Sequence, residues 1–127
     1  MLNKIKIIAV VLLIAAGNIL ATTQTAEAQD KTVTIFYSPT CPHCHHLMAF
    51  VKSTLKDQYP TVTFDFKNTN ERKNIYTWQT YKQGAGLDLS NYGVPQTYIG
   101  DELIMGFGKP ETTGKQIIEA IENKFFR

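Results

Sequence analysis

The sequence predicts an α/β domain in which a four-stranded mixed sheet is flanked by helices, in the order β-α-β-α-β-β-α. Two observations lead to this fold class. A strand-like run at 32–37, a helical apolar pattern from 42 to about 59 and an alternating run at 61–67 form a βαβ unit, whose two strands must be parallel. Two short apolar runs at 97–99 and 103–107 flank a Gly-Asp-Glu turn, which predicts an antiparallel hairpin.

Residues 1–28 have the pattern of a secretory signal peptide, so the folded domain is expected at 29–127. Two lysines precede an apolar run at 7–16, and the Ala-Glu-Ala sequence at 26–28 fits the small-x-small cleavage rule. We therefore expect export to the periplasm or the bacterial cell envelope, where disulfides can form. An uncleaved membrane anchor is the alternative, but the apolar run is short and Gly17 interrupts it.

The charges of the chain nearly balance, with 13 Lys and Arg against 11 Asp and Glu. No basic patch indicates nucleic acid or an anionic surface as a partner. No repeat, low-complexity tract or linker divides the chain after the signal peptide, which indicates one domain. We expect a monomer that contacts no membrane once the signal peptide is removed.

The first strand is predicted at 32–37, where β-branched and aromatic residues follow one another. The first helix is predicted to start at Pro42, because the missing N–H of proline would have had no partner at the first helical position. Its buried face is an apolar stripe at helical spacing, formed by Cys44, Leu47, Met48, Val51 and Leu55. The pair Cys41 and Cys44 therefore lies where a strand ends and a helix begins.

Both cysteines and all three histidines lie within 41–46, so redox or metal chemistry must centre there. Free N–H groups and the positive end of the helix dipole favour the thiolate of Cys41, the predicted nucleophile. Cys44 should be the more buried sulfur and can resolve a mixed disulfide formed at Cys41. His43 can donate a hydrogen bond or place partial positive charge near the Cys41 sulfur, which would lower its pKa further. A stabilised thiolate stabilises the reduced protein, so the pair is predicted to lean towards oxidising its partners.

A second helix is predicted at 70–83, capped by Asn70 and with Ile75 and Trp78 facing inward. Trp78 is interpreted as part of the core or of a groove wall. The segment 84–93 then breaks regular structure with three glycines, yet it carries the apolar residues Leu87, Leu89 and Tyr92.

The last helix is predicted after Pro110, which should end the sheet. The sequence 113–116, Thr-Gly-Lys-Gln, matches a capping box. The buried face of this helix is expected to consist of Ile117, Ile118, Ile121 and Phe125.

Three features together resemble the thioredoxin superfamily over essentially the whole of 29–127: a strand leading into Cys41-Pro42-His43-Cys44, a Val94-Pro95 pair opening a hairpin, and a closing helix. The short length resembles the glutaredoxin-like form of that fold. The Cys-Pro-His-Cys motif and Val94 resemble the DsbA-type oxidases, whereas the sequence 93–107 resembles bacterial glutaredoxins and related small redoxins.

The resemblance implies an exported thiol–disulfide oxidoreductase whose catalytic residues are Cys41, Cys44 and His43. In that superfamily the proline that matches Pro95 has a cis peptide bond and faces the active-site disulfide, and the backbone before it pairs with the substrate like an added strand. Substrate contacts are therefore expected at Pro42, Val94, Pro95 and Gln96.

A hydrophobic groove wall is also expected at Leu87, Leu89 and Tyr92, although these residues could instead pack onto the core. The expected partners are cysteine-containing exported proteins or small thiols, together with a redox partner that the sequence does not identify. No cofactor is required.

Two other interpretations of the motif remain. The sequence Cys-x-x-Cys-His at 41–45 also fits attachment of a c-type haem, with His45 as the axial ligand, but a haem needs a large apolar pocket of its own. A copper or zinc metallochaperone that uses the Cys/His cluster is the alternative function, although no remote ligand set is evident. His45 and His46 are interpreted as exposed residues of the first helical turns.

Overall fold

A computed structural model describes residues 29–127; the predicted signal peptide lies outside them. Four strands, β1 (Thr32–Tyr37), β2 (Thr63–Asn68), β3 (Gln96–Ile99) and β4 (Glu102–Met105), form one sheet in the order β2-β1-β3-β4. β1 pairs parallel with β2 and antiparallel with β3, and β3 pairs antiparallel with β4. The mixed sheet and the βαβ unit confirm the predicted fold class.

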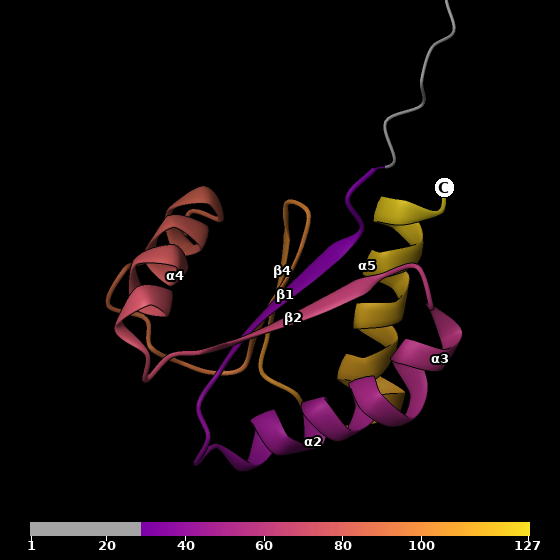
Figure 1. Cartoon of the computed structure of the whole chain (residues 1–127), viewed down its shortest axis with the longest axis horizontal. Coiled ribbons are helices and arrows are strands. Elements are labelled where there is room, and N and C mark those ends of the chain that lie inside the picture. The colour runs from indigo at the N-terminus through magenta and orange to yellow at the C-terminus, as the bar shows by residue number, and fades with distance from the viewer. Residues whose placement is uncertain (1–28) are drawn as a thin grey trace, which may run out of the picture.

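The helices cover both faces of this sheet. The first helix runs as α2 (Pro42–Phe50), a π-helical segment η1 (Val51–Leu55) and α3 (Lys56–Gln58); α4 (Arg72–Gly84) follows β2. After β4, a π-helical turn η2 (Pro110–Gly114) leads into α5 (Lys115–Phe125). Figure 1 shows α4 on one side of the sheet and α2, α3 and α5 on the other. Within residues 29–127, no helix has the length and apolar character needed to cross a membrane.

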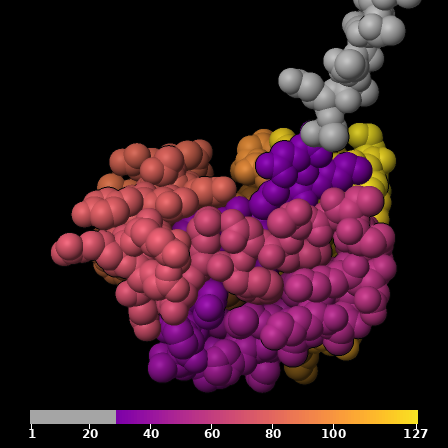
Figure 2. Space-filling model, viewed as in Figure 1, coloured from indigo at the N-terminus to yellow at the C-terminus, as the bar shows by residue number. Residues whose placement is uncertain are grey.

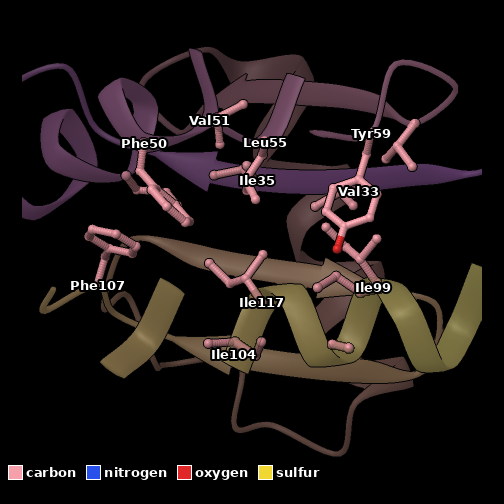
Figure 3. Packing of buried hydrophobic residues seen from close by; sticks show 14 of the residues in the cluster. Val33, Ile35, Phe50, Val51, Leu55, Tyr59, Ile99, Ile104, Phe107 and Ile117 are labelled. Atoms are coloured by element: carbon pink, nitrogen blue, oxygen red, sulfur yellow. The ribbon is translucent and has the colours of Figure 1, made fainter. Parts of the chain in front are cut away.

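The larger core lies between the sheet and the pair α2 and α5. Successive side chains of β1 alternate between the two faces, and Val33 and Ile35 point into this core. They meet helix residues that are fully buried, among them Leu47, Val51, Leu55, Ile117 and Ile121. Figure 3 labels Val33, Ile35, Val51, Leu55 and Ile117 in this layer, with Phe50 and Phe107 at one end and Tyr59 at the other.

A smaller aromatic core lies between the sheet and α4. Phe36 of β1 stacks on Trp78 with ring centroids 5.8 Å apart and meets Tyr98 edge-on at 5.7 Å. Tyr81 packs edge-on against both Phe36 and Tyr98. Tyr81 therefore lies on the face of α4 that meets the sheet, and this cluster fixes α4 against the strand that leads to Cys41.

The start of α4 differs from the prediction. The helix begins at Arg72, and Glu71, not Asn70, is the N-cap residue. The side chain of Asn68 accepts a hydrogen bond from the backbone N–H of Asn70 (2.9 Å), which makes a turn at the end of β2. Asn74 donates from its side chain to the carbonyl of Asn68 (2.9 Å), so the strand end and the helix start are tied together.

The predicted capping box at 113–116 is also wrong. Helical backbone already begins at Pro110, and the hydroxyl of Thr113 accepts a hydrogen bond from the N–H of Gly108 (3.1 Å) instead of capping a helix. The strand predicted at 103–107 ends at Met105 because Gly106 has φ +73°, which a strand does not allow. The N–H of Gly106 donates to the carbonyl of Pro95 (2.8 Å), and Phe107 turns back into the core.

Candidate active site

Cys41 and Cys44 form a disulfide at the N-terminal end of α2. Cys41 is the N-cap residue and Pro42 is the first helical residue, as the sequence predicts. The loop from β1 is closed by hydrogen bonds from the N–H of Cys41 to the carbonyl of Ser38 and from the N–H of His45 to the carbonyl of Cys41, each 3.2 Å. Strand β1, held in the centre of the sheet, therefore fixes where the disulfide lies.

The two cysteines differ in exposure. Cys44 is fully buried, whereas Cys41 is partly exposed, so an attacking thiol can reach only Cys41. The backbone N–H of Cys44 donates a hydrogen bond to Sγ of Cys41 (3.1 Å). Once the disulfide is reduced, this N–H and the positive end of the helix dipole would stabilise a thiolate on Cys41.

The Val94-Pro95 segment lies against Cys41 although it is more than fifty residues further along the chain. Its peptide bond is cis, as the resemblance implies. The carbonyl oxygen of Val94 is 3.7 Å from Sγ of Cys41. A disulfide sulfur carries no hydrogen, so this distance reports close approach and not a hydrogen bond. The structure thus brings Cys41, Val94 and Pro95 together. Pro42 follows Cys41 directly in the chain and is exposed at the start of α2.

His43 is exposed on the first turn of α2 and is bonded to a distant loop. Its Nδ1 lies 3.0 Å from the carbonyl oxygen of Phe107. A carbonyl can only accept, so Nδ1 carries the hydrogen and donates it. His43 therefore ties the start of α2 to the segment after β4, and its influence on the Cys41 thiolate remains a prediction.

The other two histidines lie on the outer side of α2. His45 donates from Nε2 to the carbonyl of Pro39 (2.6 Å), which holds the loop before Cys41, and His46 is exposed. Within residues 29–127, no group of three or more His, Cys, Asp or Glu side chains is arranged to hold a metal ion. Nε2 of His45, one of the two ring nitrogens that could bind a metal, is already used in this loop.

Gln96 was expected to contact substrate, but its side chain is fully buried. Its Oε1 accepts hydrogen bonds from Nε1 of Trp78 and from the hydroxyl of Tyr98, each 2.7 Å. Its Nε2 donates to the carbonyl of Gly93 (2.9 Å). The position is therefore structural: Gln96 holds the segment before Pro95 against α4 and cannot reach a substrate with its side chain.

The residues of the expected hydrophobic wall are placed differently from one another. Leu87 is half-buried, Leu89 is exposed, and Tyr92 is exposed with its ring 6.0 Å from that of Trp78. Of these three, Tyr92 lines a cavity together with Val94, whose carbonyl approaches Cys41. The structure thus places Tyr92 in one cavity wall with Val94, the residue next to Cys41, and does not show Leu87 or Leu89 there.

Sequence reasoning missed one residue in this region, Lys82. Its side chain is fully buried, with Nζ donating to the carbonyls of Leu89 (2.6 Å) and Asn91 (3.1 Å). Nζ also lies over the rings of Trp78 and Tyr92, 4.3 and 4.6 Å from their centroids. Burial lowers the pKa of Lys82, and the nearby carboxylate of Asp88 partly offsets this effect. A lysine on a predicted helix is normally expected to be exposed. The one local sign of its burial was Trp78, four residues earlier, because a lysine can pack its ammonium group over an aromatic ring on the same helix face.

Comparison with known proteins finds a similarity to a solved structure but to no family model or curated protein. No protein-family model matches the chain. No curated protein matches it by sequence either. Among solved structures, a glutaredoxin from Archaeoglobus fulgidus superposes with a TM-score of 0.48 at 20% sequence identity, covering 72% of this chain and 88% of its own.

Proposed function

We propose that this protein is an exported thiol–disulfide oxidoreductase in which Cys41 is the reacting sulfur and Cys44 resolves. One observation carries the proposal: a Cys-x-x-Cys disulfide with a single accessible sulfur, at a helix N-terminus, faces the Val94 carbonyl. A structural disulfide has no need of this arrangement. A loop this short would also constrain the unfolded chain little.

The exchange needs no group beyond the two cysteines and the substrate. A substrate thiolate attacks Sγ of Cys41, the bond to Cys44 breaks, and Cys44 leaves as a thiolate that takes up a proton. A second substrate thiolate then attacks the substrate sulfur of the mixed disulfide and releases Cys41 as a thiolate. Two electrons pass from the substrate dithiol to the cysteine pair. The reverse sequence starts from the Cys41 thiolate and reduces a partner.

The proposed direction is oxidising, because the N–H of Cys44 and the helix dipole both favour the Cys41 thiolate and hence the reduced protein. The proposed substrates are cysteine-containing exported proteins or small thiols in the bacterial envelope. Equilibration of the purified protein with glutathione buffers of graded ratio measures the reduction potential. A potential as low as that of a thioredoxin would contradict the oxidising direction while leaving the exchange reaction intact.

The role of each cysteine is tested by trapping. Cys44→Ser should accumulate mixed disulfides through Cys41, because the resolving sulfur is gone, whereas Cys41→Ser should form none, because Cys44 is buried. Non-reducing gels of both variants incubated with an oxidised cysteine peptide, followed by mass spectrometry, give the answer. Trapping through Cys44 would reverse the assignment, and no trapping in either variant would remove the function.

The alternative function, a copper or zinc metallochaperone, is less well supported by the geometry. The ring nitrogens Nδ1 of His43 and Nε2 of His45 are already bonded to backbone carbonyls. Metal analysis of the reduced protein after dialysis against zinc or copper distinguishes the two functions, because thiolates and not the disulfide would be the ligands. One bound metal ion per chain together with slow dithiol exchange would favour the metallochaperone function.

A further inference from the structure

The segment that joins α4 to β3 belongs to no helix or strand over residues 85–95. Close to its end, the carbonyl oxygen of Val94 lies 3.7 Å from Sγ of Cys41. In Figure 1 this segment runs beside α4 before it enters the sheet, and in Figure 2 the atoms of α4 stand in front of it. Because no backbone ladder holds such a segment, other contacts must decide where it lies.

The hydrogen bonds inside the segment give it shape but not place. Oδ1 of Asp88 accepts from the backbone N–H of Ser90 (2.7 Å) and from its hydroxyl (2.6 Å). Oδ1 of Asn91 accepts from the N–H of Gly93 (3.0 Å). Each of these bonds spans only two residues and makes a local turn. None of them fixes the distance between the segment and Cys41.

Two buried side chains attach the segment to the domain. Nζ of Lys82 donates to the carbonyls of Leu89 (2.6 Å) and Asn91 (3.1 Å). Nε2 of Gln96 donates to the carbonyl of Gly93 (2.9 Å). The carbonyls at 89, 91 and 93, every second residue, are therefore held from inside the fold. The next carbonyl along the chain is the one that approaches the reacting sulfur.

Lys82 and Gln96 form one unit through Trp78. Nζ of Lys82 lies 4.3 Å from the ring centroid of Trp78, and Nε1 of Trp78 donates to Oε1 of Gln96 (2.7 Å). Nζ also lies 4.6 Å from the ring centroid of Tyr92. A buried ammonium group is costly unless its lost water is replaced, and here two carbonyls and two rings replace it. Filling space alone would not require a charge at this position.

We propose that Lys82 is a positioning residue for disulfide exchange with polypeptides, because it sets the place of the segment 89–93 and thereby of the Val94 carbonyl against Cys41. The inference rests on the proposed function and deepens it. The Val94 carbonyl faces a disulfide sulfur that carries no hydrogen, so it can still accept a hydrogen bond from a substrate backbone. A polypeptide can use this acceptor to align its cysteine, whereas a small dithiol needs only the exposed part of Cys41.

The test compares Lys82→Met with Lys73→Met, which alters an exposed lysine of the same helix. Acid-quenched chromatography measures the second-order rate constants for reduction of the oxidised protein by a two-cysteine peptide and by dithiothreitol. We expect Lys82→Met to lower the ratio of the peptide rate to the dithiothreitol rate roughly tenfold, because the displaced carbonyl no longer aligns the peptide. Lys73→Met should leave this ratio unchanged.

Urea unfolding of the same variants separates positioning from packing. Lys82→Met should be less stable in either case, but a packing role alone would leave the rate ratio of the folded protein at its wild-type value. That result would overturn the inference. Equal slowing with both thiols and a raised pKa of the Cys41 thiol would also overturn it, because Lys82 would then act on the sulfur through its charge. Failure of the wild-type protein to react with either thiol would instead remove the proposed function.

A second variant provides the measurement if Lys82→Met does not fold. Lys82→Gln keeps a polar tip that can donate to one carbonyl, so it removes only part of the attachment. Its ratio of peptide rate to dithiothreitol rate should be several-fold below that of the wild-type protein. A ratio equal to the wild-type value would contradict the positioning role.

Discussion

At the scale of single residues, the site depends on the different exposure and hydrogen bonding of two chemically identical sulfurs. Cys44 is enclosed by the core beneath α2, while Cys41 sits at the N-cap and accepts the N–H of Cys44. His43, between them, is turned towards the carbonyl of Phe107. The histidine can therefore act on Cys41 through its charge and also on the loop after β4 through its hydrogen bond, and these two roles can be separated experimentally.

Replacement of His43 separates them. His43→Ala should raise the pKa of the Cys41 thiol and make the protein a weaker oxidant, by on the order of 30 mV for each unit of pKa change. Absorbance of the thiolate during a pH titration and equilibration with glutathione buffers measure the two quantities. His46→Ala, at another exposed histidine of the same helix, is the control. An unchanged potential with about 1 kcal/mol less stability would assign His43 only to the Phe107 contact.

The sequence predicted the residues whose role follows from local position. Cys41, Pro42 and Cys44 are set by the strand-to-helix junction, which the β-branched run and the apolar stripe define without help from distant parts of the chain. Lys82 and Gln96 could not be predicted. Their burial depends on contacts that α4 makes with the loop before Pro95, and no local pattern records such contacts.

At the scale of elements, the start of α5 is packed tightly against α2. A Cβ at Gly114 would lie 3.0 and 3.1 Å from two ring carbons of Phe50. Phe50 is itself buried and packs on Phe107 with ring centroids 5.6 Å apart. The glycine therefore allows α2, which carries the disulfide, and the start of α5 to approach closely.

A methyl group at this position should separate the two helices. Gly114→Ala is expected to destabilise the fold by about 1 kcal/mol, because overpacking outweighs the gain in helix propensity. Gly84→Ala is the matched control: nothing lies within 4 Å of its added Cβ, so it should be neutral or stabilising by up to about 1 kcal/mol. Urea unfolding of both variants measures the difference. Equal stability of the two would show that Phe50 moves aside freely.

The boundaries of elements were less predictable than their order. β1 has the predicted bounds because its burial is continuous over the run of β-branched and aromatic residues. The starts of α4 and α5 differ because Asn68 and Thr113 bond to backbone outside their helices, at Asn70 and Gly108. A capping side chain has several possible partners, and the three-dimensional path of the loop decides which one it meets.

At the scale of the whole molecule, two tyrosines link the layers and make stability depend on alkaline pH. Burial, together with a hydrogen bond to the carboxylate of Glu122 (2.6 Å) and its charge, raises the pKa of Tyr59 to about 12. Burial alone raises the pKa of Tyr98 to about 12. In the unfolded chain both would ionise near pH 10. Above that pH the unfolded state loses protons first, so stability falls between about pH 10 and 12.

Removal of one hydroxyl should reduce this loss. Tyr59→Phe should lose less stability than the wild-type protein between pH 9 and 11, by up to about 1.4 kcal/mol per pH unit above 10 for one proton. Urea unfolding at the two pH values gives the comparison, and Tyr76→Phe, whose side chain is 65% exposed, is the control. An equal loss in Tyr59→Phe and the wild-type protein would show that Tyr59 ionises alike in both states.

The π-helical segment η1 lies in the middle of one long helix, and the two ends of that helix pack against different parts of the fold. Before it, Cys44 and Leu47 face the sheet under the disulfide; after it, Leu55 is buried and Tyr59 reaches Glu122 of α5. Each residue of an α-helix advances the rotation by about 100°, so the wider turn changes the rotational phase between the two ends. The helix can thereby satisfy both orientations at once. Insertion or deletion of a single residue within η1 would reset that phase and turn Tyr59 away from α5 while the cysteine pair kept its place.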